Sequence, residues 1–304
     1  MMAMLSLIKK LKLRRWIYPV ISLWVALGLW VGSPQVSQGF SIWDILPDVI
    51  QYVQLASLGD RQEIALGKQI NQQLISQEVR IYDDPELTDY IDRIGQRLAK
   101  ESYRPPTSNY QYTFQIVDDD SVNAFATLGG FVYIHTGLMK EAENEAELAS
   151  VIGHEIAHIT ERHAINQMRR VALTNGLATA AGVDQSQIVG LGVEIALRLP
   201  HSREAEYEAD QLGLNMITAA GYAQIGMVDF MKKLARSPSR PTFLSTHPHG
   251  RDRVKALEQA IDPEFATMGN GLDPNDYQRQ IAALNGGSGD RNSSDQSDDG
   301  FWPL

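Results

Sequence analysis

The sequence contains no cysteine among its 304 residues. This absence excludes disulfide bonds, thiolate metal ligands and a cysteine nucleophile, so His, Asp and Glu are the side chains left to hold a metal ion. Basic residues are also too few to give a positive surface, because the formal net charge is -10. Such a chain offers no basic footprint to a phosphate backbone, and nucleic acid is not an expected partner.

Long apolar runs are scarce, and only the N-terminus has one that approaches the length of a membrane span. Residues 9–15 are mostly basic, residues 16–31 are apolar and residues 32–39 are small or polar. This order is typical of a secretory signal peptide, and the alternative is a retained N-terminal membrane anchor. Either form of segment 1–39 predicts an extracytoplasmic protein, in the periplasm or an equivalent lumen, and the anchor would associate it with a membrane.

The rest of the chain has the composition of one folded domain, since 43% of the residues are hydrophobic. Apolar residues recur at helical spacing after Asp60, which has a capping-box spacing to Glu63. The stretch 110–137 alternates instead, with a Gly-Gly turn inside it, and predicts a small sheet. We therefore expect an α+β, helix-rich domain over residues 40–283, followed by a disordered acidic tail, residues 284–304, that ends in Phe-Trp-Pro-Leu.

The segment SVIGHEIAHITERH carries a His-Glu-x-x-His pattern within a helix expected over residues 144–170. His154 and His158 are one turn apart, so both imidazoles can reach one ion, and Glu155 can contact a water beside it. This arrangement predicts a zinc hydrolase site with Glu155 as general base, although five residues can also match by chance. His163 would lie about 180° around the same helix from His154, so we expect a packing or hydrogen-bonding role for it.

A third ligand is expected from the later stretch PHSREAEYEADQLGLNMI. The helical face that continues from Glu206 is small or apolar, whereas the faces of Glu204 and Glu208 are polar. A carboxylate on a buried face is costly unless it is paired or binds metal, so Glu206 is the expected ligand. Asp210, one turn later, could orient a liganding histidine. Arg203 would either support this site or form solvated pairs with these acids.

Four motifs occur in a fixed order along most of the chain: VNAFATLGGFVYIHTGLM, NEAELASVIGHEIAHITERH, SREAEYEAD and STHPHGRDR. In these motifs the sequence resembles the gluzincin metallopeptidases of the CAAX-prenyl-protease, HtpX and BepA type, family forty-eight of the metallopeptidases. The chain departs from the first two branches in lacking multiple membrane spans, and from the third in having no tetratricopeptide period after residue 261. The resemblance implies a zincin-like fold with the small sheet beside the His-Glu-x-x-His helix.

The resemblance also implies the roles of individual residues. His154, His158 and Glu206 would bind one Zn²⁺ per chain, and Glu155 would be the general base. The family's His-Pro motif corresponds to His247, and the arginine after it to Arg253. His247 would then either stabilise the oxyanion, which we favour because the motif occurs in branches without evident latency, or block the zinc in a resting state.

Substrate binding is expected at the strand before the active-site helix. Asn123, Ala124, Phe125 and Ala126 have strand character and no clear later partner. They predict an exposed sheet edge that pairs with an extended peptide through main-chain hydrogen bonds.

The sequence as a whole predicts an extracytoplasmic zinc metalloendopeptidase that acts on misfolded or unassembled envelope proteins. The alternative is a periplasmic chaperone or assembly factor with a mainly structural zinc site. The presence of Glu155 argues against that alternative, because a structural site needs no base.

Overall fold

A computed structural model describes residues 58–104, 106–107, 110–174, 185–238, 241–248 and 250–286. The predicted signal peptide or anchor, residues 1–39, lies outside these ranges, as does the tail from residue 287 onwards with its terminal Phe-Trp-Pro-Leu. Within the described ranges, no helix has the length and apolar character needed to cross a membrane.

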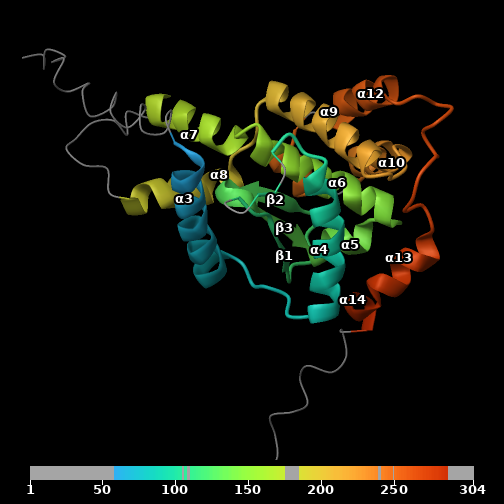
Figure 1. The fold of residues 1–304 in the computed structure, drawn as a ribbon, viewed down its shortest axis with the longest axis horizontal. Coiled ribbons are helices and arrows are strands. Elements are labelled where there is room, and N and C mark those ends of the chain that lie inside the picture. Colours follow the sequence, from blue (N-terminus) through green and yellow to red (C-terminus); the bar gives the residue numbers. More distant parts are fainter. Residues whose placement is uncertain are drawn as a thin grey trace, which may run out of the picture. The chain divides into compact units, whose positions relative to one another are not determined.

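Helices make up most of the described chain (Figure 1). In chain order the elements are α3 (Asp60–Gln73), a π-helical turn (Leu74–Glu78), α4 (Pro85–Lys100), β1 (Thr113–Val117), β2 (Ala124–Thr127), a 3-10 turn (Leu128–Gly130), β3 (Phe131–His135), α5 (Thr136–Glu141), α6 (Glu145–Thr160), α7 (His163–Thr174), α8 (Gln185–Arg198), α9 (Arg203–Ala219), α10 (Ile225–Arg236), α11 (Phe243–Thr246), α12 (Gly250–Ala260), α13 (Pro274–Gln280) and α14 (Ala282–Gly286). Because α14 extends to Gly286, the first residues of the predicted disordered tail are helical.

The three strands form one mixed sheet in the order β1-β3-β2. β3 pairs in parallel with β1 and antiparallel with β2. The turn between β2 and β3 contains Gly129 and Gly130, whose φ angles of 78° and 93° are easily adopted only by glycine. The prediction of an α+β domain with a small sheet and a Gly-Gly turn is confirmed.

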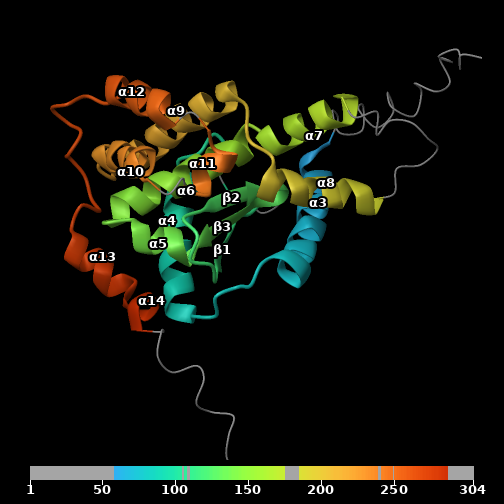
Figure 2. The same cartoon turned by 180° about the vertical axis from the view of Figure 1, so that it is seen from behind.

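Both faces of the sheet are buried, and every residue of its central strand β3 is buried. Val132 and Ile134 of β3 belong to the larger of two hydrophobic cores, with residues of α4, α6, α9 and α10. Phe131 and Tyr133 belong to the smaller core, with residues of α3, α7 and α8. This alternation follows from the opposite orientation of successive side chains in a strand. Figures 1 and 2 show the strands between these two groups of helices.

The start of α3 differs from the predicted capping box. The N-cap is Gly59, whose N–H donates to the side chain of Gln62 at 3.0 Å. Glu63 is instead turned inward, where it is buried and pairs with Arg104 at 2.9 Å. The predicted capping box of Asp60 and Glu63 was wrong. The carboxylate of Glu63, which the pattern would place at the start of the helix, forms an ion pair with Arg104 instead.

The long helix predicted over residues 144–170 was also wrong in its length. α6 ends at Thr160 and α7 begins at His163. Between them Arg162 has a φ angle of 55°, a left-handed conformation that stops an α-helix. Its guanidinium lies 2.8 Å from Glu63 of α3. An ion pair between residues far apart in the sequence therefore stabilises the end of α6.

α6 and α9 cross closely at two glycines. A Cβ atom on Gly213 would lie 3.1 Å from the backbone nitrogen of His154, and one on Gly153 would lie 3.4 Å from the carbonyl oxygen of Gly213. Because neither residue has a side chain, the two backbones approach one another directly. This approach brings the residues that flank Gly153 on α6 next to the first turns of α9.

Candidate metal centre

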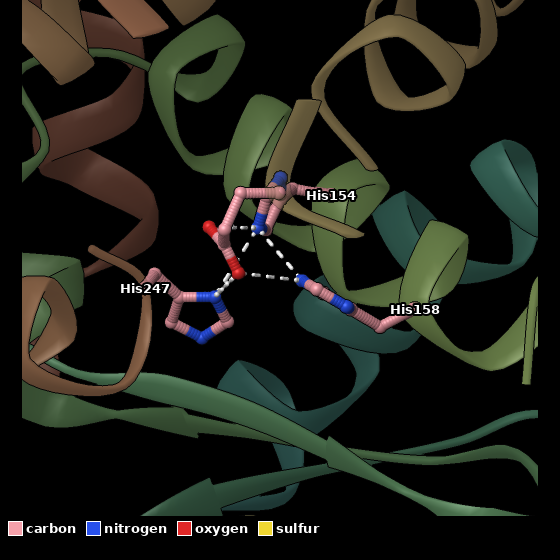
Figure 3. Close-up of side chains that lie close together, drawn as sticks. His154, His158 and His247 are labelled. Atoms are coloured by element: carbon pink, nitrogen blue, oxygen red, sulfur yellow. Dashed lines mark hydrogen bonds and ion pairs between the residues drawn. The ribbon is translucent and has the colours of Figure 1, made fainter. Parts of the chain in front are cut away.

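The His-Glu-x-x-His residues lie on α6, the central helix of the domain. All residues of α6 from Ala146 to Ile159 are buried, so its polar side chains need partners inside the protein. The Nε2 atoms of His154 and His158 lie 3.0 Å apart. The one-turn spacing therefore brings the two imidazoles together, as the sequence predicted, and Figure 3 shows them facing the same point.

Glu206 reaches this point from α9, whose N-terminus is capped by Ser202. Its carboxylate is fully buried and lies 3.6 Å from His154 Nε2 and 3.5 Å from His158 Nε2. Glu204 and Glu208 on the same helix are exposed. Helical phase thus selected the one of these three carboxylates that the structure brings to the histidines.

His247 completes the cluster from the loop after α11. Its Nδ1 atom lies 3.1 Å from a Glu206 oxygen and 3.3 Å from His154 Nε2. The ring is fully buried and stacks on Phe243, with ring centroids 4.3 Å apart. One donor atom from each of His154, His158, Glu206 and His247 lies within 4.8 Å of the others, so the four could share one metal ion (Figure 3).

Glu155 lies beside this cluster and is not one of its four donors. Its side chain is fully buried, and neither oxygen accepts a hydrogen bond from the described residues. The nearest ionisable neighbour is His247, whose Nε2 lies 3.4 Å away. Burial raises the pKa of Glu155 although His247 opposes the shift. Both oxygens are therefore available to a water molecule at the cluster, and the raised pKa makes the carboxylate a stronger base.

A buried arginine holds the acids of α9 in place. Arg253 of α12 donates two hydrogen bonds to Asp210, at 2.7 and 2.6 Å, and a third to Glu206. Asp210 in turn lies 3.1 Å from His154 Nδ1. Burial alone would raise the pKa of both carboxyls. His247 and Arg253 instead hold the pKa of Glu206 well below its usual range, and Arg253 lowers the pKa of Asp210. Both acids are therefore ionised, and Asp210 can fix the ring of His154.

Burial also keeps two imidazoles neutral, that of His158 in the cluster and that of its neighbour His201. The pKa of His158 is well below its ordinary value, because of burial and the neighbouring His201 and His154. Burial and His247 lower the pKa of His201 to about 3. A neutral imidazole has a free nitrogen lone pair, which is the form that binds a metal ion.

The predicted substrate strand is at the edge of the sheet, next to the cluster. β2 pairs only with β3 among the described strands, but Asn123, Ala124 and Phe125 are buried and only Ala126 is partly exposed. The accessible edge is therefore narrower than the sequence suggested. Ala126 lines a cavity together with the metal-centre residue His158 and with His201, so this end of the edge opens beside the cluster.

The structure does not bring Arg203 to the site. Its side chain is exposed and lies 3.5 Å from Asp252 and 3.3 Å from the hydroxyl of Tyr207. The expectation that Arg203 supports the centre was wrong, because it is the first residue of α9 and points away from the buried face.

Two histidines near the centre were not assigned to it from the sequence. His201 stacks on His158, with ring centroids 4.0 Å apart. His163 lies 2.9 Å from His158 Nδ1, so its predicted hydrogen-bonding role is confirmed. The predicted position of His163, far around a continuous helix, was wrong because the chain breaks at Arg162. No local pattern marks that break, and His201 precedes its helix without a motif of its own.

A His-Glu-x-x-His helix beside a small mixed sheet, joined by a glutamate from a later helix, defines a gluzincin-like metallopeptidase. The comparison with known families agrees with this class. The sequence model of peptidase family M48 matches residues 85–261, and the chain belongs to this family. Metal dependence follows from this membership together with the donor cluster.

Curated relatives include proteins named as beta-barrel assembly-enhancing proteases and as a mitochondrial metalloendopeptidase. A putative beta-barrel assembly-enhancing protease of Vibrio cholerae is 34% identical over 226 residues, which are 69% of this chain and 46% of the relative. The beta-barrel assembly-enhancing protease of Yersinia pestis is 36% identical over 67% of this chain and 45% of its own length. The mitochondrial metalloendopeptidase OMA1 of Arabidopsis thaliana is 34% identical over 50% of this chain and 32% of its own length. The chain thus spans about half the length of the first two relatives.

Replacement of Glu206, the predicted third ligand, should remove the metal. We expect Glu206→Gln to lower metal content strongly, because a neutral amide is a weak ligand and Arg253 loses a charged partner. Glu204→Gln is the matched control on an exposed face of the same helix, and it should retain the wild-type metal content. Elemental analysis of the purified proteins measures both. Equal metal content in the two variants would remove Glu206 from the centre.

Proposed function

We propose that this protein is a zinc-dependent endopeptidase that hydrolyses peptide bonds in misfolded or unassembled envelope proteins. The observation that carries the proposal is the position of Glu155, a buried carboxylate with two free oxygens beside the donor cluster. A metal site with only a structural role has no use for such a base. This geometry supports an enzyme over an assembly factor with a structural metal.

The spacing of the donor atoms supports zinc as the metal. Four ligands at about 2.0–2.1 Å from an ion in a tetrahedron lie about 3.3–3.4 Å from one another. The Nε2 atoms of His154 and His158 lie 3.0 Å apart, and each has an oxygen of Glu206 close by, Oε2 at 3.6 Å from His154 and Oε1 at 3.5 Å from His158. Two imidazoles and one carboxylate are also a ligand set that zinc hydrolases use.

The residues of the chain divide the chemistry among them. A bound zinc ion supplies a Lewis acid that acidifies water and polarises a peptide carbonyl. Glu155 accepts the proton of the attacking water and passes it to the amine that leaves. Asp210 and Arg253 hold His154 and Glu206 in place, so these ligands do not move during the reaction.

The names of the relatives support the substrate class, and the N-terminal sequence supports the location. The names of the relatives in Vibrio and Yersinia connect similar proteins to beta-barrel assembly. The basic-then-apolar order of residues 1–39 supports export as a cleaved signal peptide or tethering as an anchor. Together they support proteins of the cell envelope as substrates, in the periplasm or an equivalent lumen.

The test of the function separates catalysis from metal binding. Glu155→Gln should abolish the digestion of casein while retaining the zinc content of the wild type, because the amide cannot accept the proton. Zinc analysis and casein digestion by the purified proteins measure the two properties. Wild-type protein that binds zinc but cannot cleave casein or unfolded envelope proteins would favour the assembly factor.

The edge of β2 has main-chain N–H and C=O groups that could bind an extended peptide. The N–H of His135 donates to the carbonyl of Asn123 at 3.0 Å, and the register pairs Ala124 with Ile134. Since bonded and non-bonded pairs alternate in an antiparallel ladder, the peptide groups of Ala124 and Ala126 point away from β3. We propose that these groups pair with the substrate main chain.

Replacing Ala126 by proline should weaken substrate binding without loss of zinc. Proline removes an outward N–H rather than one that bonds to β3, and one hydrogen bond contributes about 0.5–1.5 kcal/mol. We expect the KM for a peptide substrate to rise by about two- to tenfold, or cleavage to be lost. Ala126→Ser retains the N–H and is the control. If the proline variant has the KM of the serine variant, the peptide binds elsewhere.

The geometry at His247 supports the second of its two roles. Its Nδ1 atom has the spacing of a fourth ligand, 3.1 Å from Glu206 and 3.3 Å from His154. A ligand there would occupy the position that a water needs during hydrolysis. We propose that His247 caps the zinc in a resting state, and that its departure opens the centre.

Removal of the cap should increase basal proteolysis. In His247→Ala the fourth position is free for water, so casein digestion should exceed that of the wild type at equal zinc content. If His247 instead donates to the oxyanion, the rate should fall by about a hundredfold or more. Steady-state rates with measured zinc content distinguish the outcomes, and an unchanged rate would exclude both roles.

A further inference from the structure

His163 lies directly behind one of the metal-centre histidines. Its Nδ1 atom is 2.9 Å from His158 Nδ1, and its Nε2 atom is 3.1 Å from an oxygen of Glu208. The side chain of His163 is 7% exposed, whereas that of Glu208 is 54% exposed. The three side chains therefore form a hydrogen-bonded chain from the buried centre to the surface.

The direction of the hydrogen bonds follows from coordination chemistry. His158 turns Nε2 towards His154 and Glu206, at 3.0 and 3.5 Å. A neutral imidazole that uses the Nε2 lone pair has its proton on Nδ1. His158 Nδ1–H then donates to His163 Nδ1, and His163 Nε2–H donates to the carboxylate of Glu208.

The backbone between α6 and α7 is what makes this contact. On a continuous helix His163 would lie about 140° around the axis from His158. The left-handed Arg162 breaks the helix, and its side chain is held by Glu63, which Arg104 also binds. The ion pairs with α3 therefore stabilise the turn that places His163 behind His158.

We propose that His163 and Glu208 are positioning residues that fix the ring and tautomer of His158 and strengthen its bond to the metal. This inference rests on the proposed zinc site and adds two residues that act through a ligand rather than on the substrate. His154 has a different support, because its Nδ1 atom faces the buried carboxylate of Asp210. The two histidine ligands are thus held independently. Asp210 of α9 contacts His154 directly, whereas Glu208 of α9 acts on His158 through His163 of α7.

Zinc affinity in competition with a chromophoric chelator tests the proposal on the full-length protein. Loss of such a partner weakens metal binding by about 10–100-fold, which we expect for His163→Ala. Glu208→Ala should cause a smaller loss in the same direction, because its exposed carboxylate orients His163 from a distance. Glu204→Ala, also an exposed carboxylate of α9, is the control and should retain wild-type affinity.

Two further measurements separate positioning from packing. His163→Asn keeps an acceptor near the position of Nδ1, so it should recover much of the affinity that His163→Ala loses. The visible spectrum of the cobalt(II)-substituted protein should change in His163→Ala and return towards wild type in His163→Asn, since it reports the ligand geometry.

The outcomes also separate this proposal from the proposed function. Wild-type affinity and spectrum in His163→Ala would overturn it, as would equal losses in the alanine and asparagine variants. If His163→Ala does not fold, the zinc affinity of Glu208→Ala is the deciding measurement. A Glu208→Ala affinity equal to that of Glu204→Ala would overturn the proposal. Wild-type protein that binds no zinc would instead overturn the zinc site itself.

Discussion

The metal centre depends on the close crossing of α6 and α9 at Gly153 and Gly213. A Cβ atom on Gly213 would meet three backbone atoms of α6 at 3.1–3.3 Å. Helix axes normally lie 8–10 Å apart, a distance set by the side chains at the contact, and small residues give the short end of that range. A wider crossing would move Glu206 and Asp210 away from His154 together, because all three are within two turns of the glycines.

Charge balance makes the same region dependent on a cation. Three carboxylates, those of Glu155, Glu206 and Asp210, are buried around one guanidinium, that of Arg253. Two negative charges are left over, and buried charge without compensation is strongly unfavourable. One divalent ion among the donors restores neutrality. The oxygens of Glu155, which accept no hydrogen bond from the described residues, are thus compatible with a stable fold because such an ion would supply the missing positive charge nearby.

Sequence periodicity predicted the parts of the site that depend on local geometry. The one-turn spacing of His154 and His158 and the phase of Glu206 follow from the helix repeat, which the buried faces of α6 and α9 preserve. The two wrong helix ends have a common cause in Glu63. Its pairing with Arg104 removes it from the capping box of α3, and its pairing with Arg162 holds the break before α7. Both contacts join residues more than 40 positions apart, so no local pattern could predict them.

Glu63 of α3 therefore affects the metal centre through the turn at Arg162. A non-glycine residue in the left-handed region costs on the order of 1–3 kcal/mol, and the break at Arg162 needs a compensating interaction. The ion pairs of Glu63 can supply it because the carboxylate is buried, where charged hydrogen bonds are stronger than at the surface. The same turn brings His163 to His158 and places Arg162 on the wall of the cavity beside Ala126. Support of a metal ligand and the shape of the adjoining cavity thus depend on a single backbone break, which α3 stabilises from outside the His-Glu-x-x-His helix.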